Sequence, residues 1–349
     1  MSADPGQIPV LDPFGAAGDE ALPTVAAALD PATVNALFKR GLPRLAGEDG
    51  FVEAKAIRVI RHKPGKRCVL EFDVRIERPG HPREKATLVG KIRARRYGRE
   101  GYRLQDAFWN AGFRKRCPDN IAVPEPVGLV PDLRLWLQRK VRGVTADQLL
   151  PEPDGLDLAG RIAAAAHKIH RAGVPPEKTH SMADELRILH ECVPRVGTRH
   201  PEFSARLQAL LTACDRLGAV VPPPLPCGIH RDFYPSQVLV DGDRLWLLDF
   251  DLYCAGDPGL DIGNFIAHLT EESLRTTGHP DTWRDREAAL ENRFVALAGE
   301  AVRPAVHAYT LLTLVRHVYL STLFPDRQRL TGQLLALCET RLAAAGFPT

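Results

Sequence analysis

Two apolar runs separated by Asp-Gly constrain the fold of this chain more than any other feature. Val238–Val240 and Leu245–Leu248 are rich in residues that favour strands, and Asp241–Gly242 lies in the short segment between them. Asp-Gly between such runs predicts a tight hairpin, because glycine accepts the positive φ angle that the turn requires. Folding the chain at this turn places Gln237 beside Asp249 at the open end of the hairpin.

The open end of the hairpin gathers three polar side chains. Gln237 is expected opposite Leu248 and next to Asp249, and Asp232 lies a few residues upstream. Mg²⁺ binds oxygen ligands from one or two carboxylates together with substrate phosphates. We therefore predict that Gln237 and Asp249 hold Mg²⁺ beside a nucleotide triphosphate. Asp232 is then left to accept or orient the proton of an attacking hydroxyl.

The order of these residues resembles the phosphotransferase family of aminoglycoside kinases, choline kinases and related small-molecule kinases. His230 and Asp232 match its His-x-Asp motif, Pro235 matches the proline that follows, and Gln237 stands at the position of the metal-binding amide. Asp249 matches the aspartate that ends a strand. His230 itself is expected to be structural, packing under the loop.

The resemblance covers only part of the chain. It is specific from Pro222 to Leu269, weaker from Val59 to Gly143, and absent before Gly47; the segment Gly256–Asn264 also looks like the family. It implies an α+β, two-lobed protein-kinase-like fold with a small antiparallel-sheet N-lobe and a mostly helical C-lobe. We expect an N-terminal helical extension at 1–50, a nucleotide-binding N-lobe at 51–141, and a catalytic and acceptor-binding C-lobe at 142–349.

Two residues depart from the kinase pattern. Gln237 stands where the family usually has Asn, and its longer side chain keeps the ligand oxygen but adds a methylene. Asp251 follows Asp249 and Phe250 where protein kinases have Gly. No Ala-Pro-Glu segment follows, so nothing marks the end of an activation loop. These departures favour the small-molecule branch over the protein kinases.

The resemblance also implies that a lysine in the N-lobe holds the nucleotide phosphates. Lys91 lies in the expected strand Ala86–Ile92, where burying a lysine is costly unless it is paired. Glu100, at the start of an expected helix from Arg99 to Trp109, is its best acidic partner, although Asp106 could serve. The alternative is a lysine at a strand end that reaches solvent.

Two further N-lobe segments are candidates for nucleotide binding. Gly65 lies in the basic loop His62–Arg67, where a kinase-like lobe covers the phosphates; an ordinary basic hairpin turn explains the loop equally well. A strand is expected at 135–141, and its backbone groups from Gln138 to Val141, just before Gly143, resemble the hinge between kinase lobes and would read the adenine edge. A plain edge strand with a turn after it is the alternative.

The remaining pattern is mostly helical. Asp30 is expected to cap a short helix beginning at Pro31, within an extension that packs on the first lobe. Apolar residues at helical spacing predict further helices at 158–172, 182–190, 203–217, 265–269, 284–298, 304–323 and 327–345. In the family the last helices form the acceptor side, and there we single out Glu271, Glu272, Arg316, His317 and Tyr319. For any one of these, an ordinary polar helix face is the alternative.

Composition is that of an ordinary globular protein, with 44% hydrophobic and 26% charged residues. Residues 1–141 carry 25 Lys and Arg against 17 Asp and Glu, whereas residues 142–349 carry 21 against 26. A basic first half suits a lobe that holds phosphates, and an acidic second half suits a cationic acceptor. The seven cysteines have no Cys-x-x-Cys spacing and are typical of reduced thiols. Met1–Gly6 lacks the features of a signal peptide, and no apolar run could cross a bilayer.

We therefore expect a cytoplasmic, ATP-dependent kinase that uses Mg²⁺ and phosphorylates a hydroxyl of an aminoglycoside, amino alcohol or sugar. Its partner would be this small molecule, not a nucleic acid or a membrane. Gln237 and the missing glycine-rich loop motivate a second hypothesis, a nucleotide-binding pseudokinase or scaffold. A metal hydrolase using His230 and Asp232 is a weaker third, because the sequence has no His-Glu-x-x-His motif.

Overall fold

The computed structural model of the protein describes residues 8–94 and 98–349 of the chain. The Met1–Gly6 segment, on which the expectation about a signal peptide rests, lies outside the described residues. The chain divides into two compact units, Met1–Arg142 and Gly143–Thr349. Among the helices of the described residues, none combines the length and the apolar character that a membrane span needs.

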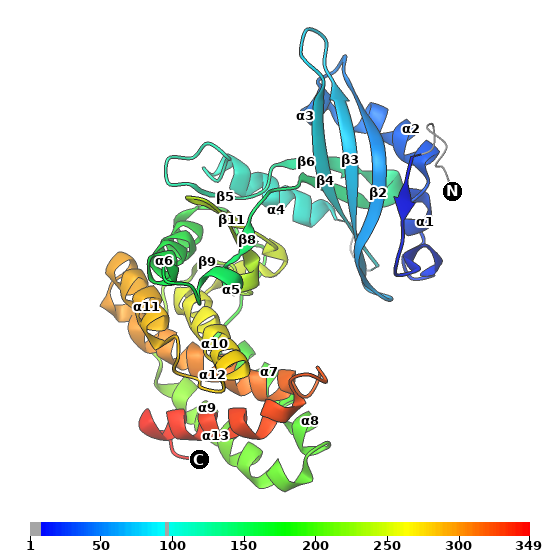
Figure 1. The fold of residues 1–349 in the computed structure, drawn as a ribbon. Coiled ribbons are helices and arrows are strands. Elements are labelled where there is room, and N and C mark those ends of the chain that lie inside the picture. Colours follow the sequence, from blue (N-terminus) through cyan, green and yellow to red (C-terminus); the bar gives the residue numbers. More distant parts are fainter. Residues whose placement is uncertain (1–7, 95–97) are drawn as a thin grey trace. The chain divides into compact units, whose positions relative to one another are not determined.

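A six-stranded sheet forms the centre of the first unit, in the order β1-β2-β3-β4-β7-β6 (Figure 1). All neighbouring strands are antiparallel except β1, which pairs parallel with β2. The strands of this unit are β1 (Val10–Leu11), β2 (Phe51–Lys63), β3 (Arg67–Glu77), β4 (Glu84–Arg93), β5 (Ile121–Ala122), β6 (Pro126–Val130) and β7 (Leu135–Arg139).

The N-terminal extension covers one face of this sheet. Alternate residues of β3, from Cys68 to Ile76, are buried in a core that also contains residues of the extension from Ala16 to Ala46. The ring of Phe38 packs edge-on against that of Phe72, with centroids 5.2 Å apart. The helices of this unit are η1 (Ala16–Gly18), α1 (Val25–Ala28), α2 (Pro31–Gly41), α3 (Pro43–Ala46), α4 (Arg99–Asn110) and η2 (Pro131–Leu133).

The second unit is mainly helical. Its longer helices are α6 (Gly155–Arg171), α7 (Met182–Cys192), α9 (Ser204–Val220), α10 (Pro258–Thr277), α11 (Arg284–Ala298), α12 (Arg303–Ser321) and α13 (Thr331–Ala344). Its short helices are α5 (Ala146–Leu149), α8 (Pro194–Gly197), η3 (Pro201–Phe203), η4 (Pro235–Gln237), η5 (Phe250–Leu252), η6 (Glu300–Val302) and η7 (Gln328–Leu330). Its strands are β8 (Val144–Thr145), β9 (Cys227–Ile229), β10 (Val238–Asp241), β11 (Arg244–Leu247) and β12 (Cys254–Gly256).

Most expected elements form, with shifts at their ends that local chemistry explains. Asp30 caps α2 as expected, accepting the Thr33 amide at 2.8 Å. The helix expected at 265–269 is too short at both ends, because α10 begins at Pro258 under an Asp257 cap and continues to Thr277. The strand expected at 135–141 is too long at its C-terminal end. β7 ends at Arg139, although the amides of Arg139 and Lys140 still donate to the carbonyls of Glu125 and Thr87, both at 2.8 Å.

Helices α10 and α12 cross closely because glycine lies at the contact. A Cβ atom on Gly259 would come within 2.8 Å of the Ala305 Cβ, and one on Gly263 within 2.7 Å of the Thr310 amide nitrogen. Side chains at these positions would push the helices apart. This crossing brings polar residues of α12 to α10 and, through it, to the loop after β9.

Candidate active site

The hairpin predicted around Gly242 is present. Strands β10 and β11 pair antiparallel with Val238 opposite Leu247, and Gly242 has a φ angle of 57°. Beyond the last strand pair, the Leu248 amide donates to the Gln237 carbonyl at 2.9 Å. This bond places Gln237 opposite Leu248, as the sequence predicts, and Asp249 is the next residue of the chain.

His230 connects the loop after β9 to the end of β11. Its side chain is buried, and its ring lies 4.8 Å from the Phe250 ring. Its Nε2 donates to the Leu248 carbonyl at 2.8 Å, because a carbonyl oxygen can only accept. His230 therefore has the structural position that we expect from the sequence, and it fastens the loop carrying Asp232 beside Asp249.

Asp261 holds the loop from the other side, a role that the sequence does not reveal. Its Oδ2 accepts the His230 amide and His170 Nε2, both at 2.8 Å, and its Oδ1 accepts the Arg231 amide at 2.7 Å. The carboxylate is fully buried near the start of α10. Arg231 has a φ angle of 68°, and a left-handed backbone costs about 1–2 kcal/mol for a residue other than glycine. The contact with Asp261 offsets that strain.

Asp232 follows this strained residue directly. Burial raises the pKa of its carboxyl, and the negative charge of Asp249 adds to the effect, whereas Arg316 opposes it. The carboxylates of Asp232 and Asp249 repel one another, so a cation bound between them would be stabilised. Asp249 also has a left-handed backbone, with a φ angle of 59°. Strained residues of this kind are often found at functional sites.

Gln237 and Asp249 fit a magnesium site by their chemistry. The Gln237 side chain is nearly buried, and its Nε2 donates to the Tyr234 hydroxyl at 3.3 Å. That bond orients the amide so that its oxygen is the end that remains for a cation. Among the described residues no group of three or more His, Cys, Asp and Glu could hold a metal. Magnesium does not need such a group, since water and substrate phosphates complete its shell.

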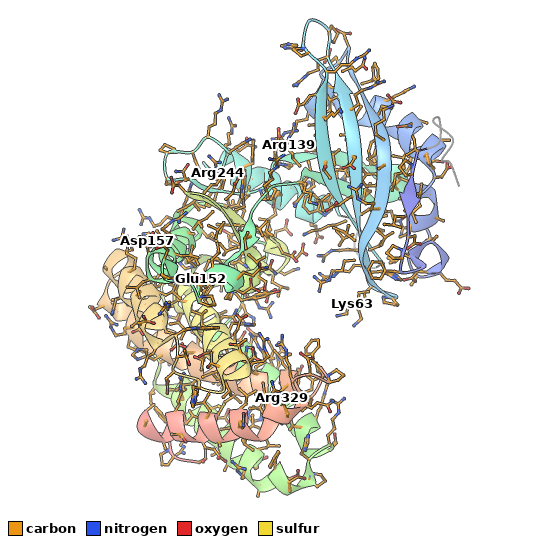
Figure 2. All side chains as sticks on the ribbon, viewed as in Figure 1. Lys63, Arg139, Glu152, Asp157, Arg244 and Arg329 are labelled. Atoms are coloured by element: carbon orange, nitrogen blue, oxygen red, sulfur yellow. The ribbon has the colours of Figure 1, made fainter. Side chains whose placement is uncertain are left out.

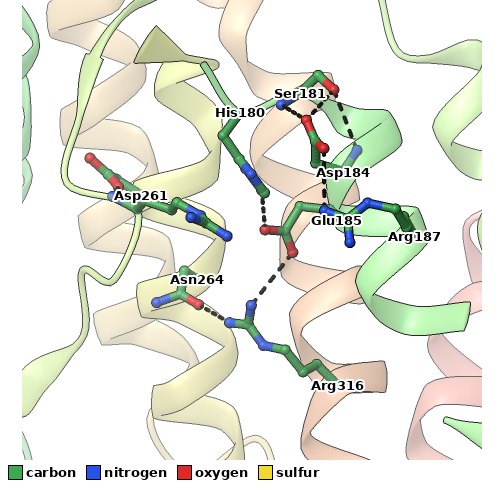
Figure 3. Close-up of polar contacts among 9 residues, drawn as sticks. His180, Ser181, Asp184, Glu185, Arg187, Asp261, Asn264 and Arg316 are labelled. Carbon is green, nitrogen blue, oxygen red and sulfur yellow. Dashed lines mark hydrogen bonds and ion pairs between the residues drawn. The ribbon is translucent and has the colours of Figure 1, made fainter. Parts of the chain in front are cut away.

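A buried polar network supports the loop from α7, α10 and α12. Asn264 Nδ2 donates to the Phe233 carbonyl at 2.9 Å, and Arg316 donates to the Asn264 oxygen at 2.6 Å. Figure 3 shows Glu185 between Arg316, at 3.5 Å, and His180, at 2.6 Å. Asn264 lies in a segment that resembles the family, whereas no sequence motif singles out His180 or Glu185.

Beside this network, aromatic rings contact the loop. The Tyr234 ring stacks on the His268 ring at 4.7 Å, and the His317 ring meets His268 edge-on at 4.5 Å. Burial lowers the pKa of His268 to about 3 and that of His317 well below its usual value, so both imidazoles are neutral. His317 Nε2 is buried and finds no hydrogen-bond partner among residues 8–94 and 98–349. Tyr319, in contrast, packs against the helical core.

Glu271 and Glu272 lie one turn further along α10. Burial raises the pKa of Glu271, and it raises that of Glu272 to about 7, with the charge of Asp147 contributing. Arg275 approaches both carboxylates, at 3.4 Å and 3.5 Å respectively. Four of the five acceptor-side residues chosen from the sequence are therefore in polar or ring contacts near the loop or on the next turns of α10.

In the first unit, Lys91 lies on β4 with its Nζ 5.4 Å from the centroid of the Trp136 ring. It pairs with Val69 and points to the face of the sheet opposite the core that the extension covers. Glu100 is exposed in the first turn of α4. The alternative partner Asp106 forms an ion pair with Arg44 instead. Glu100 thus stays the predicted partner of Lys91.

The other two predicted nucleotide segments also lie in the first unit. Gly65 occupies the turn between β2 and β3, with a φ angle of 67°. Gln138 lies near the end of β7, and Val141 lies beyond it in the irregular segment before β8. Between them the Lys140 amide donates to the Thr87 carbonyl of β4 at 2.8 Å. The nucleotide-binding roles of Gly65, Gln138 and Val141 stay predictions.

Comparison with known proteins identifies the family. The model of the phosphotransferase enzyme family matches residues 75–309, more than half of the chain. Methylthioribose kinase 2 of Oryza sativa subsp. japonica is 28% identical over 120 residues, a segment that spans 28% of that protein.

Solved structures share the fold at low identity. A choline/ethanolamine kinase family protein from Mesorhizobium loti has a TM-score of 0.53 at 14% identity, covering 89% of this chain and 94% of that one. Choline kinase LicA from Streptococcus pneumoniae has a TM-score of 0.51 at 13% identity, covering 84% and 94%. A thermostable mutant of aminoglycoside phosphotransferase APH(4)-Ia, in complex with ADP and hygromycin B, has a TM-score of 0.53 at 15% identity, covering 84% and 95%. The fold is thus α+β and protein-kinase-like, as expected, and the chain belongs to the phosphotransferase enzyme family.

Proposed function

We propose that this protein is an ATP-dependent kinase that transfers the γ-phosphoryl group to a hydroxyl of a small molecule. The observation that carries the proposal is the way two carboxylates are held together. His230 joins the loop of Asp232 to the residue before Asp249, and Asp261 fixes the same loop through two backbone amides. Fixed carboxylates are what phosphoryl transfer requires, because its catalysis is mostly positioning and electrostatics.

Each residue has a distinct role in this proposal. Asp232 accepts or orients the proton of the acceptor hydroxyl, and its raised pKa brings it closer to the operating pH of a general base. Asp249 and Gln237 hold Mg²⁺, which neutralises charge on the nucleotide phosphates. Lys91 contributes positive charge to the same phosphates, and Glu100 orients Lys91.

The first unit would also supply the remaining nucleotide contacts. The turn that contains Gly65 covers the phosphates, and backbone groups from Gln138 to Val141 read the adenine edge. The structure of the related aminoglycoside phosphotransferase with ADP and hygromycin B supports the use of a nucleotide and a small hydroxylated acceptor. The similarity to methylthioribose kinase 2 supports the same class of reaction.

The charges on the acceptor side favour a sugar or an amino alcohol over a polycationic aminoglycoside. Three carboxylates near the loop, those of Glu185, Glu271 and Glu272, each lie within 3.5 Å of an arginine nitrogen of Arg316 or Arg275. Carboxylates with such partners are poorly suited to bind several ammonium groups. The half-buried rings of Tyr234 and His268 suit the apolar face of a sugar or a short carbon chain.

Asp147 differs, because within the described part of the chain its carboxylate has no arginine or lysine partner. Asp147 accepts the Ser236 hydroxyl at 3.1 Å, and its charge helps to raise the pKa of Glu272 to about 7. At neutral pH Glu272 is therefore partly protonated and can donate to an acceptor hydroxyl. A single uncompensated charge of this kind is compatible with an acceptor that carries at most one amine.

The test is acceptor-dependent release of ADP from Mg-ATP with panels of sugars, amino alcohols and aminoglycosides. Asp232→Asn should reduce turnover by roughly 100-fold to 10,000-fold while Mg-ADP binding persists. Asp243→Asn, in the exposed tip of the same hairpin, is the matched control and should leave turnover unchanged. Unchanged turnover in Asp232→Asn would remove that residue from its role.

The second candidate is a nucleotide-binding pseudokinase or scaffold, which Gln237 in place of asparagine favours. Binding of Mg-ADP without phosphorylated product across the whole panel would support it over the kinase. If the Gln237→Asn variant turned over and the wild type did not, the longer side chain of Gln237 would be the cause of the inactivity.

A further inference from the structure

A carboxylate of the N-terminal extension is bonded to the turn between β2 and β3. Asp19 Oδ2 accepts the Gly65 amide at 2.8 Å and also lies 2.8 Å from His62 Nε2. Its other oxygen, Oδ1, accepts the Ala21 amide at 3.0 Å. One side chain therefore fastens its own loop to a turn that lies more than forty residues further along the chain.

The geometry of the turn explains why it needs an external acceptor. The Lys66 amide donates to the Lys63 carbonyl at 3.0 Å, Pro64 follows Lys63, and Gly65 has a φ angle of 67°. Proline followed by a residue with positive φ is typical of a type II turn. In that turn the amide of the third residue points away from the closing bond, so Gly65 must find an acceptor elsewhere.

Neighbouring residues cover most of the two side chains in this contact, whereas the backbone of Gly65 is exposed. The side chains of Asp19 and His62 are only 9% and 7% exposed. The Gly65 amide and the His62 ring lower the pKa of Asp19, so its carboxylate is charged at neutral pH. A charged acceptor forms a stronger hydrogen bond than a neutral one.

The turn is also tied to the strand that carries Lys91. Arg67 pairs with Arg93, and the Ala94 amide donates to the Lys66 carbonyl at 3.0 Å. Exposed Lys63 and Lys66 extend from the turn, and Figure 2 shows Lys63 at its end. Asp19 lies among extension residues that belong to the core face of the sheet, whereas Lys91 points to the opposite face. The Asp19 carboxylate therefore contacts the turn from the core face of the sheet, opposite the face of Lys91.

We propose that Asp19 is a positioning residue that fixes the β2–β3 turn for binding of nucleotide phosphates. The proposal rests on the proposed function, in which this turn covers the phosphates. Residues 19 and 65 both precede the segment 75–309 that matches the family model.

Two measurements on the full chain test the proposal. Amide hydrogen exchange resolved over residues 62–67 reports whether the turn is held, and calorimetric titration with Mg-ADP reports nucleotide affinity. In Asp19→Ala we expect exchange in the turn to become about tenfold faster and Mg-ADP binding to become about tenfold weaker, because the Gly65 amide loses its acceptor. Asp19→Asn keeps an oxygen acceptor, so we expect a smaller increase in exchange and a smaller loss of Mg-ADP affinity.

Asp30→Ala is the matched control. It removes another aspartate of the extension, which caps α2, and should change neither exchange in the turn nor Mg-ADP affinity. Unchanged exchange in Asp19→Ala would overturn the contact, and faster exchange with unchanged or tighter Mg-ADP binding would overturn its positioning role. Absence of Mg-ADP binding by the wild-type protein would instead overturn the proposed function. Slow exchange along β3 in every variant verifies that the sheet is folded.

Discussion

Replacing Asp261 by asparagine should weaken both the second unit and the proposed catalysis. The aspartate accepts three N–H donors with two oxygens while fully buried. Asparagine has one oxygen and one NH₂ group. If its oxygen takes the place of Oδ2, it keeps the His230 amide and the His170 ring but turns its NH₂ toward the Arg231 amide. The opposite orientation loses two acceptor contacts instead of one.

The magnitude follows from these contacts. Losing one hydrogen bond to a charged group costs about 1.5–3 kcal/mol. The two bonds that remain change from charge-assisted to neutral, which weakens each by about half, or roughly 1 kcal/mol. We therefore expect Asp261→Asn to lower the free energy of unfolding by about 4 kcal/mol. Because Arg231 is then released from its left-handed backbone, Asp232 shifts, and a displacement of about 1 Å can cost 100-fold in rate.

Urea unfolding followed by far-ultraviolet circular dichroism measures the loss, since the helices of the second unit dominate that signal. The matched control is Asp257→Asn, four residues earlier in the same helix. Asp257 accepts one amide, that of Gly259 at 2.8 Å, and burial raises the pKa of its carboxyl. Asparagine is an equally good cap, so this variant should change stability by less than about 0.5 kcal/mol. Similar losses in both variants, or a loss below about 1 kcal/mol in Asp261→Asn, would refute the reasoning.

Two further predictions concern the metal site and pH. Gln237→Leu should raise the Mg²⁺ concentration for half-maximal ATP turnover at least about tenfold, whereas Gln237→Asn should retain activity; a Mg²⁺ titration that gives equal midpoints would contradict the ligand role. Burial raises the pKa of Glu287 from 4.5 to about 7. The folded state therefore prefers its protonated form, and stability falls as pH rises from about 4.5 to 7, by up to about 3 kcal/mol. In thermal melts, the melting temperature of Glu287→Gln should therefore rise relative to that of the wild type between pH 5 and 8. Glu291→Gln should lose stability instead, because His307 and Arg303 outweigh burial and lower the pKa of Glu291.

The sequence predicts the hairpin and its consequences well because these depend on local rules. Asp-Gly between two apolar runs fixes the register, and the register brings Gln237 opposite Leu248. The start of α2 is equally local, since it needs only a capping Asp30. The ends of elements are predicted less well, since α10 begins at Pro258 and not at the expected Phe265. β7 likewise ends at Arg139, before the expected Val141.

Long-range polar contacts explain what the sequence does not reveal about the site. Glu185 on α7 reaches Arg316 on α12, which is 131 residues away, and neither belongs to a short motif. Asp19 reaches Gly65 in the same way. Such pairs require the helices and strands to be placed first. Charge and burial then decide which of several acidic residues finds a basic partner, as with Asp106, which pairs with Arg44.

The glycines and the polar residues of the segment Gly256–Asn264 therefore have separate physical roles. Gly259 and Gly263 allow α12 to approach, and this approach lets Arg316 reach Asn264. Asn264 in turn fixes the carbonyl of Phe233, the residue after Asp232. Asp261 fixes the two amides before Asp232, so that the loop is held on both sides of the proposed catalytic carboxylate.

This arrangement makes the position of Asp232 depend on helix packing as well as on the loop itself. A larger residue at position 263 would meet backbone of α12 at 2.7 Å and force the helices apart. Arg316 would then leave Asn264, and its charge would no longer oppose the raised pKa of Asp232. The same helix crossing thus controls both the geometry and the protonation of the proposed catalytic group, so changes in helix packing should alter activity even where they do not touch a ligand.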